Sequence, residues 1–234
     1  MKKLLNVLVL VLLAVSTVTL TSCGGNDDKF KVGLICLHDE SSTYDKNFID
    51  SMYRAIDQLG LSEDQLELVT GIGEDNTCYE KASELAQTCD IIFADSFGHE
   101  DFMIQAAEEN EDVWFCHSTG TKAHTKNLDN YFNAFASIYE GRYLAGIVAG
   151  MKLNEMINNG DITPEQAVMG YVGAFPYAEV VSGYTSFYLG AKSVCPSVTM
   201  KVRYTSSWYD FDKEKSAAEA LMQNDGCVLR CIGG

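Results

Sequence analysis

The segment Lys31–Leu37 reads KVGLICL, a short apolar run with β-branched residues, which is typical of a buried parallel strand. The segment Asp45–Leu59 follows with DKNFIDSMYRAIDQL, whose apolar side chains recur three or four residues apart, as on one face of a helix. Gly60 then ends the helical pattern. This pair predicts a strand followed by a helix, and the same order recurs along the chain.

The repeated order predicts a first lobe over residues 31–136. Its strands are nearly continuous in apolar residues, as expected when helices cover both faces of a parallel sheet. Because the connections are short, we expect a doubly wound α/β lobe. The further strands are predicted at Leu66–Ile72, Asp90–Ala94 and Val113–His117, and the further helices at Thr77–Thr88 and His99–Asn110; a polar loop, Ser118–Asp129, and the segment Asn130–Ala136 complete the lobe.

A second alternation begins near residue 137 and predicts a partial second α/β lobe over residues 137–234. Its long helix, Ile138–Ile157, carries small residues such as Gly146 and Gly150, which allow close packing against a neighbour. Two parallel-sheet lobes with an interlobe cleft are typical of proteins that clamp small ligands. The other elements are predicted at Ala167–Phe175, Ala178–Ser193, Thr199–Tyr204, Asp212–Gln223 and, for the start of one more strand, Cys227–Leu229.

Residues 1–22 have the pattern of an export signal. Lys2 and Lys3 precede a mostly apolar stretch, and small residues lead to Cys23. This ending resembles a bacterial lipobox, which implies that Cys23 is lipidated and that residues 23–30 form a polar tether. A single spanning helix is the alternative, at the lower limit of length. We expect an extracytoplasmic protein held at the bacterial cell membrane by lipid.

The chain is acidic, with 17 Lys and Arg residues against 33 Asp and Glu residues and a formal net charge of −16. Such a chain repels the phosphates of nucleic acids, so nucleic acid is not an expected partner. Binding to anionic lipid through a basic surface is disfavoured for the same reason.

Cysteine spacing predicts neither a redox centre nor a zinc ribbon, because no CxxC pair occurs. Cys36 and Cys116 lie in apolar runs and are expected to be small buried hydrophobic residues. We predict no disulfide among the cysteines besides Cys23, which are Cys36, Cys78, Cys89, Cys116, Cys195, Cys227 and Cys231.

Enzymatic motifs are missing from the sequence. There is no GxSxG elbow around Ser182 and no glycine-rich phosphate loop, so we predict that the chain is not an enzyme and takes no cofactor. Cys116, His117 and His124 could be imagined as metal ligands, but the strand pattern directs Cys116 into the core and the histidines flank a loop. No metal site is predicted.

Aromatic residues and carboxylates recur at the carboxyl ends of the predicted strands, where ligands bind in open α/β sheets. Aromatic rings stack on a flat heterocycle, and carboxylates accept hydrogen bonds from hydroxyl and amino groups, so the pattern suits a ring that carries a sugar. Asp45 and Asp210 are expected instead to cap or begin helices. The candidate ligand-binding residues are Asp39, Phe48, Phe97, Asp101, Phe175 and Trp208.

Four segments carry a specific resemblance: FADSFGHEDFMIQAA, FASIYEGRYLAGIVAG, GYVGAFPYAEVVSGYTSFYLGAKS and YTSSWYDFDKEKSAAEAL, which begin at residues 93, 135, 170 and 204. Between about Lys31 and Leu229 the chain resembles the basic membrane protein family of lipoproteins, the purine nucleoside receptor A-like substrate-binding components of ABC importers. The resemblance implies a type I periplasmic-binding-protein fold. It also implies ligand capture between two lobes, and delivery to a permease and an ATPase as partners.

Carried over by position, Phe48 and Trp208 would be the opposing aromatic walls of a nucleoside site, and Asp39 a polar contact. Phe97 and Asp101 match the second loop of the family, and Phe175 a loop of the second lobe. Ile49 replaces the asparagine of typical nucleoside binders, and serines replace the two glycines of the first loop, so a flavin or a sugar remains an alternative ligand.

Family members continue beyond the position at which this sequence ends, so the second lobe and the strands that return to the first are expected to be incomplete. We expect a truncated product that is poorly stable or inactive alone. The leading interpretation is a solute-binding lipoprotein of an ABC importer for a nucleoside or a similar ring-bearing molecule. The alternatives are a ligand-sensing surface lipoprotein on the same fold and an extracytoplasmic enzyme.

Overall fold

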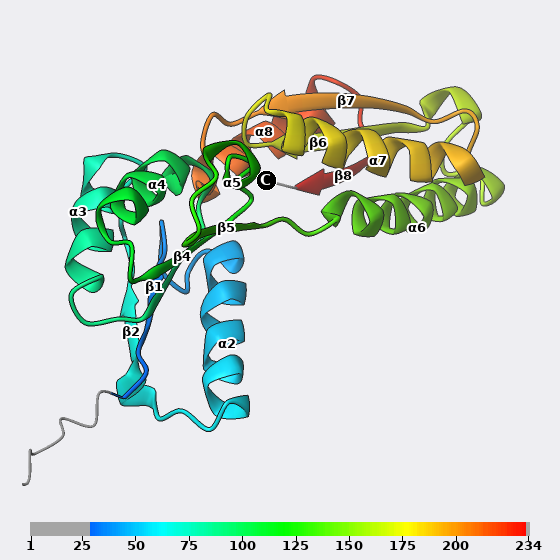
Figure 1. Cartoon of the computed structure of the whole chain (residues 1–234). Helices are drawn as coiled ribbons and strands as arrows, with labels where there is room; N and C mark the ends of the chain where they lie inside the picture. The colour runs from blue at the N-terminus through cyan, green and yellow to red at the C-terminus, as the bar shows by residue number, and fades with distance from the viewer. Residues whose placement is uncertain (1–28, 233–234) are drawn as a thin grey trace, which may run out of the picture. The chain divides into compact units, whose positions relative to one another are not determined.

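Two parallel sheets organise the chain, one in each of two units that are divided between Ala134 and Phe135 (Figure 1). The computed structural model describes residues 29–232. The predicted export signal, the predicted lipidation site at Cys23 and most of the predicted tether therefore lie outside the described residues. The predicted α/β class with parallel sheets is confirmed.

The first unit contains a five-stranded sheet with helices. Its elements are β1 (Val32–Ile35), α2 (Thr43–Gln58), η1 (Glu63–Gln65), β2 (Leu66–Val69), α3 (Asn76–Leu85), β3 (Ile91–Ala94), η2 (Phe97–His99), α4 (Glu100–Glu109), β4 (Trp114–Ser118), α5 (Ala123–Lys126) and β5 (Tyr131–Ala134). The strand order is β2-β1-β3-β4-β5, and every pair is parallel. The carboxyl ends of β1 and β3 are therefore neighbours, with Ile35 opposite Ala94.

Apolar side chains alternate between the two faces of this sheet and bury both of them. On one face Leu34 packs with Ile49 of α2. On the other face Ile35 and Ile92 pack in a cluster with residues of α3 and α4, among them Met103. Helices cover both faces, as the near-continuous apolar strands predict.

The second unit contains a three-stranded parallel sheet. Its elements are α6 (Ile138–Asn158), η3 (Pro164–Gln166), β6 (Val168–Gly173), α7 (Ala178–Val194), β7 (Thr199–Tyr204), α8 (Phe211–Gln223) and β8 (Leu229–Ile232). The strand order β7-β6-β8 places β6 in the centre. Residues of α6 and α7 form a buried cluster with Met169 and Tyr171 of β6, whereas Leu221 of α8 packs with Val172.

Helices α6 and α7 pack at backbone contact distance, and Figure 1 shows them running side by side. A Cβ atom added at Gly146 would collide with the carbonyl group of Phe187, and one added at Gly190 with the carbonyl group of Tyr143. Only glycine allows this approach, because any larger residue would meet backbone atoms that side-chain rotation cannot move. The predicted close packing of the long helix is confirmed.

Local structure differs from the sequence prediction at several element ends. Strand β2 ends at Val69 rather than Ile72, and β6 ends at Gly173, so Phe175 lies in the loop beyond the strand. The loop predicted at residues 118–129 contains the short helix α5. Strand β8 is formed by Leu229–Ile232 and so begins two residues later than predicted, after Gly226, which has a positive φ of 69°.

Both aspartates lie at helix starts, as predicted, but only one of them is a cap. Asp210 is the N-cap of α8 and accepts a hydrogen bond from the backbone N–H of Lys213, as predicted. The N-cap of α2 is Ser42, whereas Asp45 lies in the first turn with only 1% of its surface exposed. The side chain of Asp45 therefore belongs to the interior.

The seven cysteines within the described range are free thiols. Cys36 is buried as predicted, but Cys116 is only partly buried, because it lies on the less covered face of β4 beside exposed Trp114.

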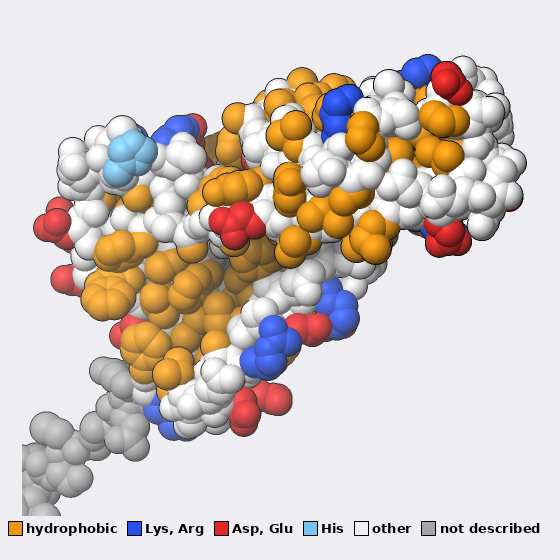
Figure 2. Space-filling view, turned by 90° about the vertical axis from the view of Figure 1, so that its right-hand side faces the viewer, with side chains coloured by type: hydrophobic (Ala, Val, Ile, Leu, Met, Phe, Trp, Pro, Cys, Tyr) orange, Lys and Arg blue, Asp and Glu red, His pale blue; other side chains and the backbone are white. Residues whose placement is uncertain are grey.

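Large hydrophobic side chains also reach the surface of both units (Figure 2). On α6, Leu144, Val148 and Met151 are each at least 60% exposed and are spaced as one helix face. Between residues 29 and 232, no helix combines the length and the hydropathy needed to cross a membrane.

Candidate ligand-binding site

Three aromatic rings gather beyond the carboxyl ends of β6 and β7. The rings of Phe175 and Tyr177 are stacked, with centroids 5.1 Å apart and an interplanar angle of 13°. The Trp208 ring meets Phe175 edge to face at 5.0 Å and lies 6.0 Å from the Tyr177 ring. Since β6 and β7 are adjacent parallel strands, their following loops meet at one edge of the sheet. The structure thus brings together two predicted site residues, Phe175 and Trp208.

A small hollow lies beside this aromatic cluster. Its volume of about 10 Å³ is enough for about one water molecule, so a larger ligand would lie against the rings rather than inside the hollow. Backbone and hydroxyl groups offer hydrogen bonds next to an aromatic surface here. The hollow is lined by Val172, Gly173, Ala174, Thr205, Ser207, Trp208 and Glu214.

In the first unit, Asp39 lies exposed in the loop between β1 and α2. Its carboxylate accepts hydrogen bonds from the Ser41 hydroxyl at 2.5 Å and from the Ser41 backbone N–H at 2.9 Å. These two hydrogen bonds, the hydroxyl first, lower the pKa of Asp39, so the group is an anion at neutral pH. The serine at position 41 therefore holds the carboxylate in a fixed orientation.

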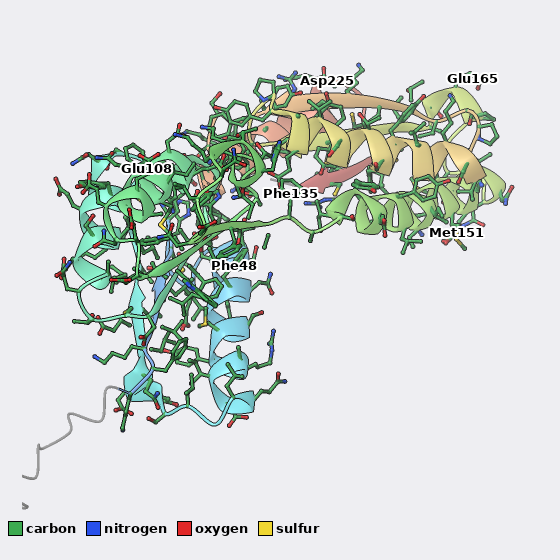
Figure 3. All side chains as sticks on the ribbon, viewed as in Figure 1. Phe48, Glu108, Phe135, Met151, Glu165 and Asp225 are labelled. Atoms are coloured by element: carbon green, nitrogen blue, oxygen red, sulfur yellow. The ribbon has the colours of Figure 1, made fainter. Side chains whose placement is uncertain are left out.

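Phe48 lies in the second turn of α2 and is half-buried (Figure 3). Its ring is tilted against the Tyr44 ring, with centroids 5.0 Å apart. The Tyr44 hydroxyl donates a hydrogen bond to the backbone carbonyl oxygen of Asp95 at 2.9 Å. Tyr44 thus connects the first turn of α2 to the end of β3 and gives Phe48 an aromatic neighbour.

Phe97 and Asp101 lie one turn apart where η2 passes into α4. Phe97 is half-buried, and the Asp101 side chain is 69% exposed. The Asp101 carboxylate forms an ion pair with the Lys122 ammonium, with Nζ and Oδ1 2.5 Å apart. Lys122 follows β4, so this pair links the first turn of α4 to the loop after β4.

A buried polar network supports these loops. The carboxylate of Glu100, which is 5% exposed, accepts hydrogen bonds from the backbone N–H groups of Thr121 and Lys122 at 2.7 and 2.8 Å. Nε2 of buried His117 lies 2.7 Å from the carbonyl oxygen of Ser96, so this nitrogen carries the hydrogen. Burial lowers the pKa of His117, which is therefore neutral at pH 7. The network holds the loops after β3 and β4 against each other.

Two aromatic residues of these loops, Tyr44 and Tyr177, are not among the residues predicted from the sequence. Their signal is positional: Tyr44 precedes Phe48 by one helical turn, and Tyr177 follows Phe175 across Pro176. Of the six predicted residues, Asp39, Phe48, Phe97 and Asp101 belong to the first unit.

Parallel α/β units with aromatic and carboxylate side chains on the loops beyond their strands define the class of α/β solute-binding proteins. The model of the PnrA-like ABC transporter substrate-binding protein family matches residues 32–229. The chain belongs to this family, and the resemblance inferred from the four sequence segments is confirmed.

Curated relatives cover different parts of the chain. A purine-binding protein of Brucella abortus is 40% identical over 132 residues, which are 56% of this chain and 33% of that protein. A putative ABC transporter glucose-binding protein of Haloferax volcanii is 39% identical over 138 residues, which are 59% of this chain and 31% of that protein. The ABC transporter nucleoside-binding protein BmpA of Lactococcus lactis is 25% identical over 224 residues, which are 90% of this chain and 58% of that protein. The chain thus spans between 31% and 58% of the length of these relatives.

Solved structures share the fold at low sequence identity. A solute-binding protein of an ABC transporter system from Aeropyrum pernix matches with a TM-score of 0.72 at 15% identity and covers 87% of this chain and 54% of that one. A solute-binding protein from Conexibacter woesei matches with a TM-score of 0.63 at 19% identity. The match covers 87% of this chain and 63% of that one. The periplasmic-binding-protein-like fold class is therefore confirmed.

Proposed function

We propose that this chain captures a nucleoside or a similar ring-bearing small molecule for an ABC importer. Membership of the PnrA-like substrate-binding family supports the transport role. The observation that carries the choice of ligand is the cluster of Phe175, Tyr177 and Trp208, whose rings present aromatic faces and edges at the end of a parallel sheet. Planar heterocycles bind to such surfaces by stacking.

The names of two relatives support the same ligand class. The Brucella abortus relative is a purine-binding protein, and the Lactococcus lactis relative is a nucleoside-binding protein. In our proposal Trp208 and Phe48 stack on the base, and the ionised Asp39 accepts hydrogen bonds from the ligand. Phe97, Asp101 and Phe175 complete the set of contacts. The chain has no catalytic role in this proposal.

The location and the protein partners follow from the transport role. We propose an extracytoplasmic protein, anchored through lipid on Cys23, that hands its ligand to a permease driven by an ATPase. The pattern of residues 1–22 supports the export and the anchor. A change of Cys23→Ala should release the protein from the membrane fraction, whereas Cys36→Ala should leave it attached.

Isothermal titration calorimetry of the purified chain tests the ligand class. Inosine, adenosine, uridine, riboflavin, ribose and glucose serve as the panel. Saturable heat with at least one purine nucleoside, together with a raised midpoint of thermal unfolding, would support the proposed ligand class and would contradict the prediction that this chain is inactive alone. Binding of the free sugars, with no response to any nucleoside, would contradict the proposed ligand class while leaving the family membership intact.

A sugar is the second candidate ligand, because the Haloferax volcanii relative is named as a glucose-binding protein. Aromatic rings and carboxylates also bind sugars, since rings contact the apolar faces and carboxylates accept hydroxyl protons. The two candidates differ in the base. A nucleoside should therefore bind much more tightly than ribose alone if the first proposal is right.

A further inference from the structure

Three buried side chains with metal-ligating atoms meet at the carboxyl edge of the first sheet. Cys36 directly follows β1, Asp45 lies in the first turn of α2, and Asp95 directly follows β3. The thiol sulfur and one oxygen from each carboxylate lie within 4.8 Å of one another. All three residues are at most 1% exposed. A thiol and two carboxylates are thus enclosed together, away from solvent.

One oxygen of this cluster lacks a hydrogen-bond donor. Oδ1 of Asp95 accepts a hydrogen bond from the backbone N–H of Leu37 at 3.2 Å. Within residues 29–232 no donor reaches Oδ2 of Asp95 in full hydrogen-bonding geometry, although the Cys36 thiol and the Asp45 carboxyl group lie near enough to Asp95 to shift its pKa through side-chain hydrogen bonding. A fully buried carboxylate oxygen without a partner is costly unless a proton or a cation completes it.

Neighbouring donors hold the second carboxylate in place. Oδ1 of Asp45 accepts from the backbone N–H of His38 at 2.8 Å, and Oδ2 accepts from the Ser42 hydroxyl at 2.5 Å. Such outer contacts orient metal ligands in protein sites. His38 lies beside this carboxylate, with Nδ1 3.4 Å from Oδ2 of Asp45.

Two groups of the cluster have raised pKa values. Burial, followed by the charge of Asp45, raises the pKa of Asp95 to about 7. Burial, with the nearby charge of Asp95, raises the pKa of the Cys36 thiol far above its usual range. Both groups are therefore disfavoured as free anions in this interior, chiefly because they are buried.

We propose that Cys36 Sγ, Asp45 Oδ2 and Asp95 Oδ2 bind a divalent transition-metal ion of the zinc type. Sulfur is the ligand that separates zinc from calcium and magnesium, which prefer all-oxygen sites. On binding, the metal–sulfur bond forms and the thiol proton leaves to solvent. His38, whose Nδ1 is 3.4 Å from Asp45 Oδ2 and whose side chain is 32% exposed, borders the cluster on the side open to solvent.

The ion would join three elements of the first unit. It would connect the end of β1, the start of α2 and the end of β3, and so fix the loop that carries Asp39. None of the three proposed metal ligands is among the residues proposed to contact the nucleoside. A metal site and a nucleoside site can therefore be tested separately.

Titration of the purified chain with cobalt(II), followed by zinc(II), tests the site. Cobalt bound to a thiolate gives a near-ultraviolet charge-transfer absorption, so we expect this band to saturate at one equivalent and to disappear when zinc displaces cobalt. Cys36→Ser should abolish the band. Cys116→Ser, which removes a partly buried thiol from β4, should retain it.

A second pair of variants keeps the test independent of the cysteine change. Asp95→Asn preserves the shape and the acceptor for Leu37 N–H but removes a ligand charge, so we expect cobalt affinity to fall at least about tenfold, since even outer-shell partners have effects of that size. Asp50→Asn, on the exposed side of α2, should leave the affinity unchanged. No thiolate band in the wild type, or a band that survives in folded Cys36→Ser, would overturn the proposal.

Discussion

The indole ring of Trp208 meets the Phe175 ring edge to face, with centroids 5.0 Å apart and an interplanar angle of 61°. The two residues follow different strands, β6 and β7, which are adjacent and parallel. Tyr177 stacks on the other ring of the pair, Phe175. Three rings that support one another are held in place before a ligand arrives, so less conformational entropy is lost when a ligand binds.

Replacement of this indole tests its role in binding. We expect Trp208→Ala to weaken nucleoside binding by roughly 1–3 kcal/mol, the range found for stacking of a base on an aromatic side chain. Calorimetry with the best nucleoside of the panel measures the change. Phe175→Ala should have a further effect, because it removes the ring on which Trp208 rests.

The other tryptophan provides the control. Trp114 is 58% exposed on β4, where its ring contacts Phe132. Trp114→Ala should leave nucleoside affinity unchanged. Equal affinities of Trp208→Ala and the wild type would show that the aromatic cluster is not the binding surface.

The alternation of strands and helices could be predicted from the sequence, because apolar runs such as that of β1 and the helical spacing in α2 are local patterns. The strand order β2-β1-β3-β4-β5 could not, since pairing depends on contacts between segments distant in sequence. Element ends were also missed: β6 stops at Gly173 because the chain turns there, and the apolar run continues to Phe175.

Part of the candidate site was predictable for a geometric reason. The loops after adjacent parallel strands meet at one edge, which is why Phe175 and Trp208 are neighbours. The role of Asp45 was not predictable, because an aspartate near a helix start reads as a cap. Its burial depends on β1 and β3, which bring Cys36 and Asp95 to the same position. Tertiary contacts therefore override the local signal at this cluster.

The exposed ion pair of Asp101 and Lys122 allows binding to be separated from stability. Exposed ion pairs stabilise a fold little, so Asp101→Asn should leave the midpoint of thermal unfolding almost unchanged. If Asp101 contacts the ligand, affinity should fall about tenfold or more, because hydrogen bonds to charged groups are strong. Glu108→Gln on the same helix, which pairs with Lys126, is the control and should not affect affinity. An unchanged affinity in Asp101→Asn would remove this residue from the site.

Buried His117 predicts a loss of stability in mild acid. Burial lowers its pKa in the folded state, so below about pH 6.5 the unfolded chain binds a proton that the folded chain excludes. The contribution of His117 to the free energy of unfolding should therefore be fully present above about pH 6.5 and decrease as the pH falls through that value. Denaturant unfolding between pH 5 and pH 8 measures the slope.

A matched pair of histidine variants shows how much of the pH dependence of the free energy of unfolding comes from His117. His117→Gln removes the titrating ring and should flatten the pH dependence. Of the remaining slope, His99, whose pKa burial also lowers, should contribute with the same sign, and Asp95, whose pKa burial raises to about 7, with the opposite sign. His124→Gln, on the exposed side of α5, should leave the dependence as in the wild type. A slope that is identical in His117→Gln and the wild type would contradict the assignment.

The contact between α6 and α7 predicts opposite effects of the same substitution at two glycines. At Gly190 a new Cβ atom would collide with the backbone carbonyl of Tyr143, which forces the helices apart. Gly190→Ala should therefore destabilise the second unit by about 1–3 kcal/mol, the usual cost of overpacking, or by more because backbone must move. At Gly141 on α6 a Cβ atom meets nothing within 4 Å, so Gly141→Ala should stabilise by about 0.5–1 kcal/mol. Thermal unfolding measures both variants, and a stabilised Gly190→Ala would show that the helices are farther apart than described.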